Sequence, residues 1–291
     1  MEYGLAFASS IAFDHDNALE LCRRAAGAGF GSLWGGEHVI IPTEISSRYP
    51  YTADGKIPAT PETPIPDPLI WLAFAAAAAP GLRLGTCILI VPQRNPVVLA
   101  KELATLDRLC GGGVDLGIGV GWMQEEFDAI GVPWARRGAR TDEYIAAMRT
   151  LWSGPEVEFH GEFVDFGRVT CSPRPVHAKI PIIVGGDTDA AMNRAVRLGD
   201  GWYPGQSDPA ALAPLVTTMR ERAAAAGRDP SSISLHVNYG IPRGSADEVA
   251  EHIGRLTELG VTRLMVPAFA FVGPGGLDRM DAFAEHLRAA C

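Results

Sequence analysis

No stretch of the sequence is long and apolar enough to cross a bilayer. The longest uninterrupted apolar run extends from Leu69 to Ala79 and ends at Pro80, whereas a membrane-spanning helix needs about 20 apolar residues. The first residues carry an acid, Glu2, rather than the basic region of a secretory signal. We therefore expect no membrane partner and a cytoplasmic location.

Basic residues are in the minority. Lys and Arg number 25 against 34 Asp and Glu, which gives a formal net charge of −9. There is no basic block of the kind that follows a phosphate backbone, so nucleic acid is not an expected partner. The five cysteines are widely spaced and form no Cys-x-x-Cys pair, which favours reduced thiols over a disulfide framework.

Several common catalytic motifs are also missing. The sequence contains no G-x-x-x-x-G-K-[ST], no G-x-S-x-G and no H-E-x-x-H, so the usual nucleotide, serine-hydrolase and zinc-protease interpretations lose their main support. Most histidines lie far apart without metal-ligand spacing, and we expect no metal site. The histidines that we expect to be structural or exposed are His15, His160, His177, His236, His252 and His286.

The sequence does contain ample apolar material, 47% of the residues, arranged as short runs that predict strands. Several runs are apolar at nearly every position, as in parallel sheets that are covered on both faces. The predicted strands are Tyr3 to Ala8, Gly31 to Trp34, Leu82 to Val91, Val114 to Gly119, Ile180 to Val184, Gly201 to Pro204, Ile233 to Asn238 and Thr262 to Pro267.

Helical patterns alternate with these runs throughout the chain. Eight strand and helix pairs predict a single α/β domain over residues 1–291, a closed (β/α)8 barrel of the TIM type with insertions. The alternative is an open doubly wound sheet, but its G-x-G-x-x-G turn is absent, because Trp122 stands where the third glycine would be. The predicted helices are Asn17 to Ala28, Pro68 to Ala79, Pro96 to Leu109, Thr141 to Trp152, Asp189 to Leu198, Pro209 to Ala226, Ala246 to Leu259 and Leu277 to Ala290.

Two segments interrupt the alternation. The first runs from Glu37 to Asp67 and is rich in proline. A loop of this length after a barrel strand is usually a lid or a binding loop. The second, from Glu156 to Phe166, has the pattern of a hairpin that turns at His160-Gly161, and we expect it to be peripheral.

The best acid/base candidate is His38, which follows Glu37 directly after the second predicted strand. The catalytic rim of a barrel lies at this end of its strands, and histidine exchanges protons near neutral pH. The alternative is a loop histidine that only bonds its neighbours. Position alone does not separate the two interpretations.

Gly185-Gly186-Asp187-Thr188 ends the fifth predicted strand and opens a helix. Free amide groups and the positive end of a helix dipole make this a candidate phosphate cradle. The alternative is a tight turn in which Asp187 or Thr188 caps the helix. On an acidic protein, a phosphorylated cofactor needs such localised donors.

Two further glycine-containing segments are candidate ligand contacts. In Gly85-Thr86-Cys87-Ile88 the glycine marks a bulge or a close backbone approach, and Cys87 has no basic neighbour that would activate it, so a structural thiol is favoured. In Gly119-Val120-Gly121-Trp122 the glycines admit a flat ligand, and Trp122 either walls the pocket or anchors the loop.

Taken together, the segments resemble the bacterial luciferase-like superfamily, and within it the actinobacterial class of oxidoreductases that use the deazaflavin coenzyme F420. The resemblance extends over most of the chain and depends on the order and spacing of its motifs. These are Trp34-Gly35-Gly36-Glu37-His38, Tyr49-Pro50-Tyr51, Asp67-Pro68, Leu84-Gly85-Thr86, Pro92-Gln93-Arg94-Asn95-Pro96, Leu99-Ala100-Lys101, Ala104-Thr105-Leu106-Asp107, Leu116 to Trp122, Gly131-Val132-Pro133, Ile183-Val184-Gly185-Gly186 and Asp200-Gly201-Trp202.

The resemblance implies a cofactor ring bound at the carboxyl ends of the strands, beside a non-prolyl cis peptide at Cys87-Ile88. It implies hydride transfer at the deazaflavin C5, with the protein supplying position and electrostatics, and a homodimer. The residues that it implies as catalytic are His38 and Glu37. Cofactor contacts are implied by the resemblance or suggested by the segments above. They are Glu37, His38, Thr86, Cys87, Ile88, Val120, Gly121, Trp122, Gly185, Gly186, Asp187 and Thr188.

One departure from the family pattern bears on the substrate. Sugar-phosphate dehydrogenases of this class have a glutamate as proton donor where this sequence has Trp122, which puts that substrate class in doubt, and Glu125 and Glu126 are out of register. His38 or water remains as the donor. Aromatic residues near the rim predict a hydrophobic small-molecule substrate; they are Tyr49, Tyr51, Phe269 and Phe271.

Three functions are compatible with these observations. The first is an F420-dependent reductase or dehydrogenase. The second is a monooxygenase on the same barrel that uses reduced FMN and oxygen. The third is a cofactor-binding barrel without catalysis, which would bind but not turn over.

Overall fold

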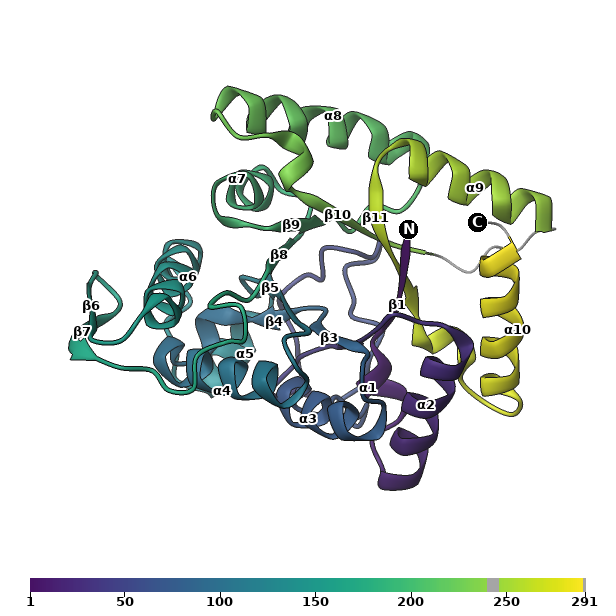
Figure 1. Ribbon diagram of the computed structural model, residues 1–291, viewed down its shortest axis with the longest axis horizontal. Helices are drawn as coiled ribbons and strands as arrows, with labels where there is room; N and C mark the ends of the chain where they lie inside the picture. Colours follow the sequence, from purple (N-terminus) through teal and green to yellow (C-terminus); the bar gives the residue numbers. More distant parts are fainter. Residues whose placement is uncertain (240–245, 290–291) are drawn as a thin grey trace.

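A computed structural model describes residues 1–239 and 246–289. Within them, eight parallel strands close into a barrel (Figure 1). Each strand pairs with its neighbour in chain order, and β3 pairs with β5 to complete the ring. The predicted (β/α)8 fold is confirmed. The barrel strands are β1 (Glu2–Ala6), β2 (Ser32–Gly35), β3 (Arg83–Thr86), β5 (Val114–Gly119), β8 (Ile182–Gly185), β9 (Gly201–Tyr203), β10 (Ser234–Asn238) and β11 (Val261–Pro267).

Helices surround the barrel, and most begin with a side-chain cap. Asp14, Asp67, Asn95, Thr188 and Asp208 each accept a hydrogen bond from an amide in the first turn of their helix. The predicted helices are confirmed, although Ala290 lies outside the described residues. They are α2 (His15–Ala28), α3 (Pro68–Ala78), α4 (Pro96–Leu109), α6 (Arg137–Ser153), α7 (Asp189–Leu198), α8 (Pro209–Ala225), α9 (Ala246–Glu258) and α10 (Gly276–Ala289).

Two predicted strand boundaries are wrong. The first strand ends at Ala6, because Phe7 has a left-handed backbone (φ 57°) and α1 (Ala8–Ile11) follows. The strand predicted from Leu82 to Val91 is divided. After β3 comes a cis peptide between Cys87 and Ile88, then β4 (Leu89–Ile90) and the 3₁₀ turn η1 (Val91–Gln93). The cis peptide itself was predicted at this position.

Both predicted interruptions are present. Residues 36–67 form neither helix nor strand, so the long segment after β2 is a loop. The second interruption is the antiparallel hairpin of β6 (Val157–His160) and β7 (Asp165–Val169), which stands apart from the barrel beyond α6 (Figure 1). Three short helical elements complete the described chain: α5 (Gln124–Ala129), η2 (Pro230–Ser232) and η3 (Ala268–Phe271). No helix within the described ranges is long and apolar enough to span a membrane.

Glycines inside the barrel make room for large neighbours. A Cβ at Gly85 would lie 2.2 Å from the ring of the fully buried Trp34, and a Cβ at Gly117 would lie 1.9 Å from the carbonyl oxygen of Thr86. The close approach predicted at Gly85 is therefore an approach to a core tryptophan. It lets β3 pack against β2 and β5 near the axis of the barrel.

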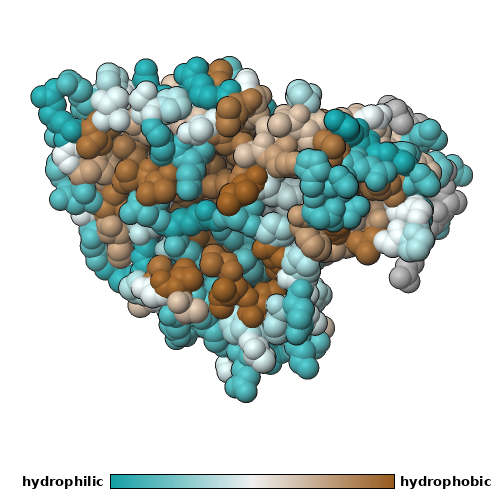
Figure 2. All heavy atoms as spheres, turned by 90° about the horizontal axis from the view of Figure 1, so that it is seen from below, coloured by the Kyte–Doolittle hydropathy of each residue, from teal (hydrophilic) through white to brown (hydrophobic). Residues whose placement is uncertain are grey.

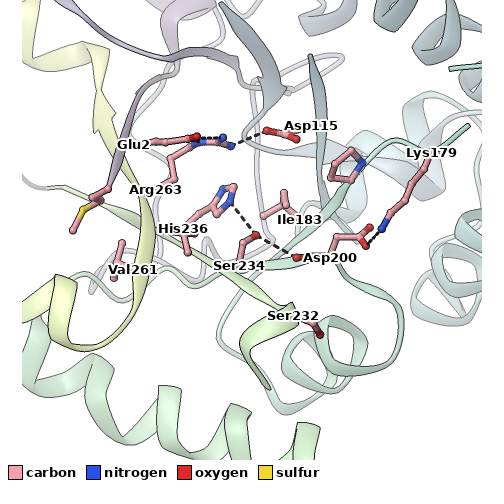
Figure 3. A pocket seen from close by; sticks show the side chains of 13 residues that line it. Glu2, Asp115, Lys179, Ile183, Asp200, Ser232, Ser234, His236, Val261 and Arg263 are labelled. Carbon is pink, nitrogen blue, oxygen red and sulfur yellow. Dashed lines mark hydrogen bonds and ion pairs between the residues drawn. The ribbon is translucent and has the colours of Figure 1, made fainter. Parts of the chain in front are cut away.

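The amino-terminal end of the barrel is held by a network of charged groups around the buried Arg263 and Asp115 (Figure 3). The Arg263 guanidinium, 6% exposed, donates to Asp115 at 2.7 Å and to Glu2 at 3.1 Å, and Arg83 also donates to Asp115. His236 lies beside them at the wall of a cavity of about 750 Å³. Because these charges pair with one another at the end of a barrel opposite to its catalytic rim, we interpret this network as a stabilising one.

Candidate active site at the carboxyl end of the barrel

His38 follows β2 and pairs with a residue that the sequence analysis set aside. Its Nδ1 atom lies 3.2 Å from Oε2 of Glu126, on the short helix α5 after β5. The other carboxylate oxygen of Glu126 accepts a hydrogen bond of 2.6 Å from the amide of Val39. The His38 side chain is 12% exposed and that of Glu126 is 1% exposed. The structure thus forms a histidine–carboxylate pair at the rim.

Glu37 has a different setting. Its carboxylate accepts hydrogen bonds from the amide of Ile90 at 2.5 Å and from Nε of Arg94 at 2.8 Å, and Arg94 also bonds Asp67. Burial raises the pKa of the Glu37 carboxyl, and the charge of Arg94 opposes this rise. Both oxygens are occupied, so Glu37 fixes the segment after the cis peptide to the end of β2. This placement favours His38 over Glu37 as the proton-exchanging group.

Aromatic side chains form an arc over the rim. The Trp122 ring packs edge-on against His38 at 5.9 Å and against Tyr49 at 5.1 Å, and Tyr49 in turn packs against Tyr51 at 5.4 Å. Trp122 therefore both anchors the long loop and walls the space beside His38. Through these contacts the loop 36–67 reaches from β2 past the end of β5.

Glu125 also holds the loop 36–67 in place. Its carboxylate accepts hydrogen bonds from the amides of Ser46 at 2.6 Å and Ser47 at 3.0 Å. Burial opposes ionisation of Glu125, but the hydrogen bonds from Ser47 and Ser46 outweigh it and lower the pKa of this carboxyl to about 2. The carboxylate is thus charged at neutral pH and keeps the base of the loop in place.

The predicted phosphate cradle lies under Tyr51. Gly186 has a φ of 110°, and a Cβ there would lie 3.5 Å from the Tyr51 hydroxyl. Thr188 caps α7 by accepting a hydrogen bond from the amide of Ala191, whereas Asp187 accepts one from Gly205. Burial, followed by the negative charge of Asp187, raises the pKa of Tyr51 to about 12. Thr188 is therefore the cap, and Gly186 lies between the Cβ of Ala191 and the Tyr51 hydroxyl, where a side chain would have little room.

The segment around the cis peptide contributes mainly to the barrel interior. Thr86 is 1% exposed and donates to the carbonyl of Gly117 at 2.6 Å, so its hydroxyl is bonded within the barrel. Burial raises the pKa of the Cys87 thiol to about 12, which agrees with the structural thiol that was predicted. Ile88 differs, because a Cβ at Gly119 would lie 1.9 Å from its Cδ1 atom and one at Gly185 would lie 3.1 Å from its Cγ2 atom. Its side chain covers the ends of β5 and β8.

One cation at the rim was not predicted. Arg137 begins α6, its Nε donates to the carbonyl of Gly121 at 3.2 Å, and its guanidinium stacks on Trp134 at 3.5 Å from the ring centroid. Gly121 has a φ of 82°. No carboxylate among the described residues forms an ion pair with Arg137, so it can accept an anion beside the glycine that the sequence analysis assigned to cofactor contact.

The opposite wall of the rim is aromatic as predicted, with one correction. Phe269, after β11, is 52% exposed and stacks on Phe7 after β1 at 5.4 Å. Phe271 was predicted to line the same pocket, but it is 6% exposed and packs against Phe283 of α10. The short η3 turn reverses the chain between the two residues, which directs Phe271 into the core.

The comparison with protein-family models decides the family. The model described as luciferase-like monooxygenase matches residues 4–251. The chain belongs to this family. An uncharacterised protein of Mycobacterium tuberculosis is 36% identical over 248 residues, which cover 85% of this chain and 83% of that protein.

Proteins that are similar to this chain in sequence or in fold use different cofactors. An FMNH2-dependent dimethylsulfone monooxygenase of Pseudomonas putida is 33% identical over 177 residues, 59% of this chain and 48% of that protein. An F420-dependent secondary alcohol dehydrogenase, solved with an F420–acetone adduct, superimposes with a TM-score of 0.75 and 18% identity, over 100% of this chain and 99% of that one. At this identity the likeness shows the fold alone. Proteins similar to this chain in sequence or in fold therefore include an FMNH2-dependent and an F420-dependent enzyme.

Proposed function

We propose that this luciferase-like protein is an oxidoreductase that uses coenzyme F420 and transfers a hydride between the deazaflavin C5 and a small hydrophobic substrate. The observation that carries the proposal is the pairing of His38 with the buried Glu126 at the rim of the barrel. Hydride transfer to or from carbon needs a group that exchanges a proton with the substrate, and a histidine held by a carboxylate supplies one.

The residues at the rim fit a phosphorylated cofactor. Gly121 and Gly186 both have positive φ values, a backbone conformation that residues with side chains rarely adopt. The first amides of α7 have no helical acceptor, and the Arg137 guanidinium has no carboxylate partner within the described chain. These groups would hold the phosphate, and the Cys87-Ile88 segment would support the ring. When bound, the cofactor would supply the hydride chemistry.

The aromatic arc and the opposite wall favour an apolar substrate. Trp122 and Tyr49 flank His38 on one side, and the stacked pair of Phe7 and Phe269 forms the other wall. Such walls bind and orient hydrophobic molecules and exclude water. Enones and quinones are apolar molecules with activated double bonds. When such a bond is reduced, one of its atoms must gain a proton.

A monooxygenase that uses reduced FMN is the second candidate. The 33% identity to the Pseudomonas putida dimethylsulfone monooxygenase favours it. The two candidates differ in the requirement for oxygen, because a deazaflavin does not activate oxygen as a flavin does.

An assay under anaerobic conditions tests the proposal. Reduced F420 is incubated with the protein and a panel of hydrophobic enones and quinones, and oxidation of F420 is followed by absorbance. We expect oxidation that depends on the protein and on the substrate. No anaerobic reaction with reduced F420, together with substrate-dependent oxygen consumption in a parallel aerobic assay with reduced FMN, would support the monooxygenase instead.

We further propose a homodimer. Figure 2 views the molecule from the side where α2 and α3 lie and shows apolar side chains gathered on this surface. Ile70 of α3 is 76% exposed, and Val97 and Val98 of α4 are 40% and 54% exposed. Apolar side chains that gather on one exposed surface favour an interface there, and a symmetric pair would cover them.

Replacing Arg137 by Gln weakens cofactor binding about fivefold, or about 1 kcal/mol, because a charge-assisted contact to the phosphate is lost. Titration of the variant and the wild type with F420 measures this difference.

Arg140 is a second arginine on α6 and serves as the matched control, because it donates to the carbonyls of Pro133 and Ala135. We expect Arg140→Gln to lower stability and to leave the affinity for F420 unchanged. Equal affinities of wild type and Arg137→Gln would remove Arg137 from the site. Substitution of Gly186 is a poorer test, because its φ of 110° strains any side chain.

A further inference from the structure

Glu126 connects two consecutive residues of the loop that follows β2. It is fully buried, its Oε1 atom accepts from the Val39 amide, and its Oε2 atom contacts His38 Nδ1. The first contact has a fixed direction, because a backbone N–H only donates. The second depends on which ring nitrogen of His38 carries the proton.

We propose that Glu126 is a positioning residue that holds His38 in the Nδ1–H tautomer, so that Nε2 is the atom that exchanges a proton with the substrate. An ionised carboxylate has no proton to donate, so Nδ1 must be the donor in this contact. Nε2 then carries the lone pair. The inference rests on the proposed function, in which His38 is the proton-exchanging group.

The surroundings of His38 support a single ring orientation. Trp122 packs edge-on against the ring, and only 12% of the side chain is exposed. Glu37, the neighbouring carboxylate, is bonded to Arg94 and Ile90 and offers His38 no alternative acceptor. Among the described residues, Nε2 has no hydrogen-bond partner in the protein, which leaves it for the substrate.

The arrangement assigns two tasks to the pair. In the oxidising direction, Nε2 takes the proton of the substrate while the electron pair of the broken bond stays on the substrate, and the Glu126 carboxylate stabilises the imidazolium that forms. In the reducing direction, the imidazolium returns the proton from Nε2. A histidine held in the other tautomer has no lone pair at Nε2 and loses the first task.

Glu126→Gln reverses the tautomer with little change of shape. The Val39 amide requires the oxygen of the new side-chain amide, so the NH2 group faces His38. Nδ1 must then accept a hydrogen bond, and the proton moves to Nε2. Glu125→Gln is the matched control, because Glu125 bonds the amides of Ser46 and Ser47 and does not contact His38.

The tautomer is measured by NMR correlation of the imidazole protons and nitrogens in the cofactor-free protein at alkaline pH. We expect a protonated Nδ1 in the wild type and in Glu125→Gln, and a protonated Nε2 in Glu126→Gln. A wild-type ring protonated at Nε2 would overturn the proposal without any variant, and so would an unchanged tautomer in Glu126→Gln.

Turnover separates this inference from the proposed function. We expect Glu126→Gln to lower kcat for substrate oxidation at least about tenfold, with KM little changed, because a ring without a lone pair at Nε2 cannot take the proton of the substrate. A reversed tautomer with an unchanged kcat would contradict the proposed role of His38 and would leave the positioning role of Glu126 supported. A lowered kcat with an unchanged tautomer would overturn the positioning role.

Discussion

Replacement of His38 by Gln lowers turnover at least about tenfold, which corresponds to about 1.4 kcal/mol of transition-state stabilisation. The glutamine amide reaches about as far as the imidazole but cannot exchange a proton. Cofactor affinity changes little, because the groups assigned to the phosphate lie after β5, on α6 and at the start of α7 rather than on the loop after β2. Steady-state kinetics and a cofactor titration on the same preparation measure both effects.

His160→Gln is the control for this substitution. His160 pairs with Asp165 on the hairpin of β6 and β7, which stands apart from the barrel (Figure 1). We expect its turnover to equal that of the wild type. An unchanged rate in His38→Gln would remove His38 from the mechanism, and equal losses in both variants would indicate a general effect on folding.

Mild acid destabilises the protein through His236, which lies in the network at the amino-terminal end of the barrel. The ring is 3% exposed, packs edge-on against Trp34 at 5.7 Å and lies 3.3 Å from the Ser234 hydroxyl (Figure 3). Burial, followed by the positive charge of Arg263, lowers the pKa of His236 to about 3. The folded state therefore keeps the ring neutral, whereas the unfolded chain takes up a proton near pH 6.5.

The sign of the effect follows from this difference. The contribution of neutral His236 to stability is complete above pH 6.5 and is lost as the pH falls from 6.5 towards 3, by about 1.4 kcal/mol for each unit. Between pH 6.5 and pH 5 the loss is about 2 kcal/mol. Urea unfolding at several pH values measures it.

Two variants isolate this contribution. In His236→Gln the side chain does not titrate, so the difference in unfolding free energy between variant and wild type shifts by about 2 kcal/mol in favour of the variant between pH 6.5 and pH 5. His177→Gln, at an exposed position, leaves the pH dependence as in the wild type. If the unfolding free energies of wild type and His236→Gln changed in parallel with pH, the proposed contribution of His236 would be contradicted.

The fold was predictable from the sequence because strands buried on both faces are continuous apolar runs and because the helices carry their own caps. Asn95 and Thr188, for example, mark where α4 and α7 begin. The division of the third strand was not predictable from the apolar pattern, since the residues of Leu82 to Val91 are mostly apolar on both sides of the cis peptide. The resemblance to the family supplied that feature.

The site was predictable only in part. His38 stands out because it directly follows a strand that ends at the catalytic rim. Its partner Glu126 is 88 positions away in the chain and comes from a helix whose orientation no local pattern specifies. Arg137 was missed for the same reason, because its contact with Gly121 depends on how α6 packs beside β5. Glu37 was predicted at the rim, but its pairing with Arg94 is a tertiary contact.

The central claim is the choice of cofactor, and a side-by-side fluorescence titration of the purified protein with F420 and FMN tests it most directly. The account predicts saturable binding of F420 at micromolar concentration and much weaker binding of FMN. Preference for FMN would contradict it and would direct the search to oxygen-dependent chemistry. Binding of neither cofactor would contradict both catalytic proposals.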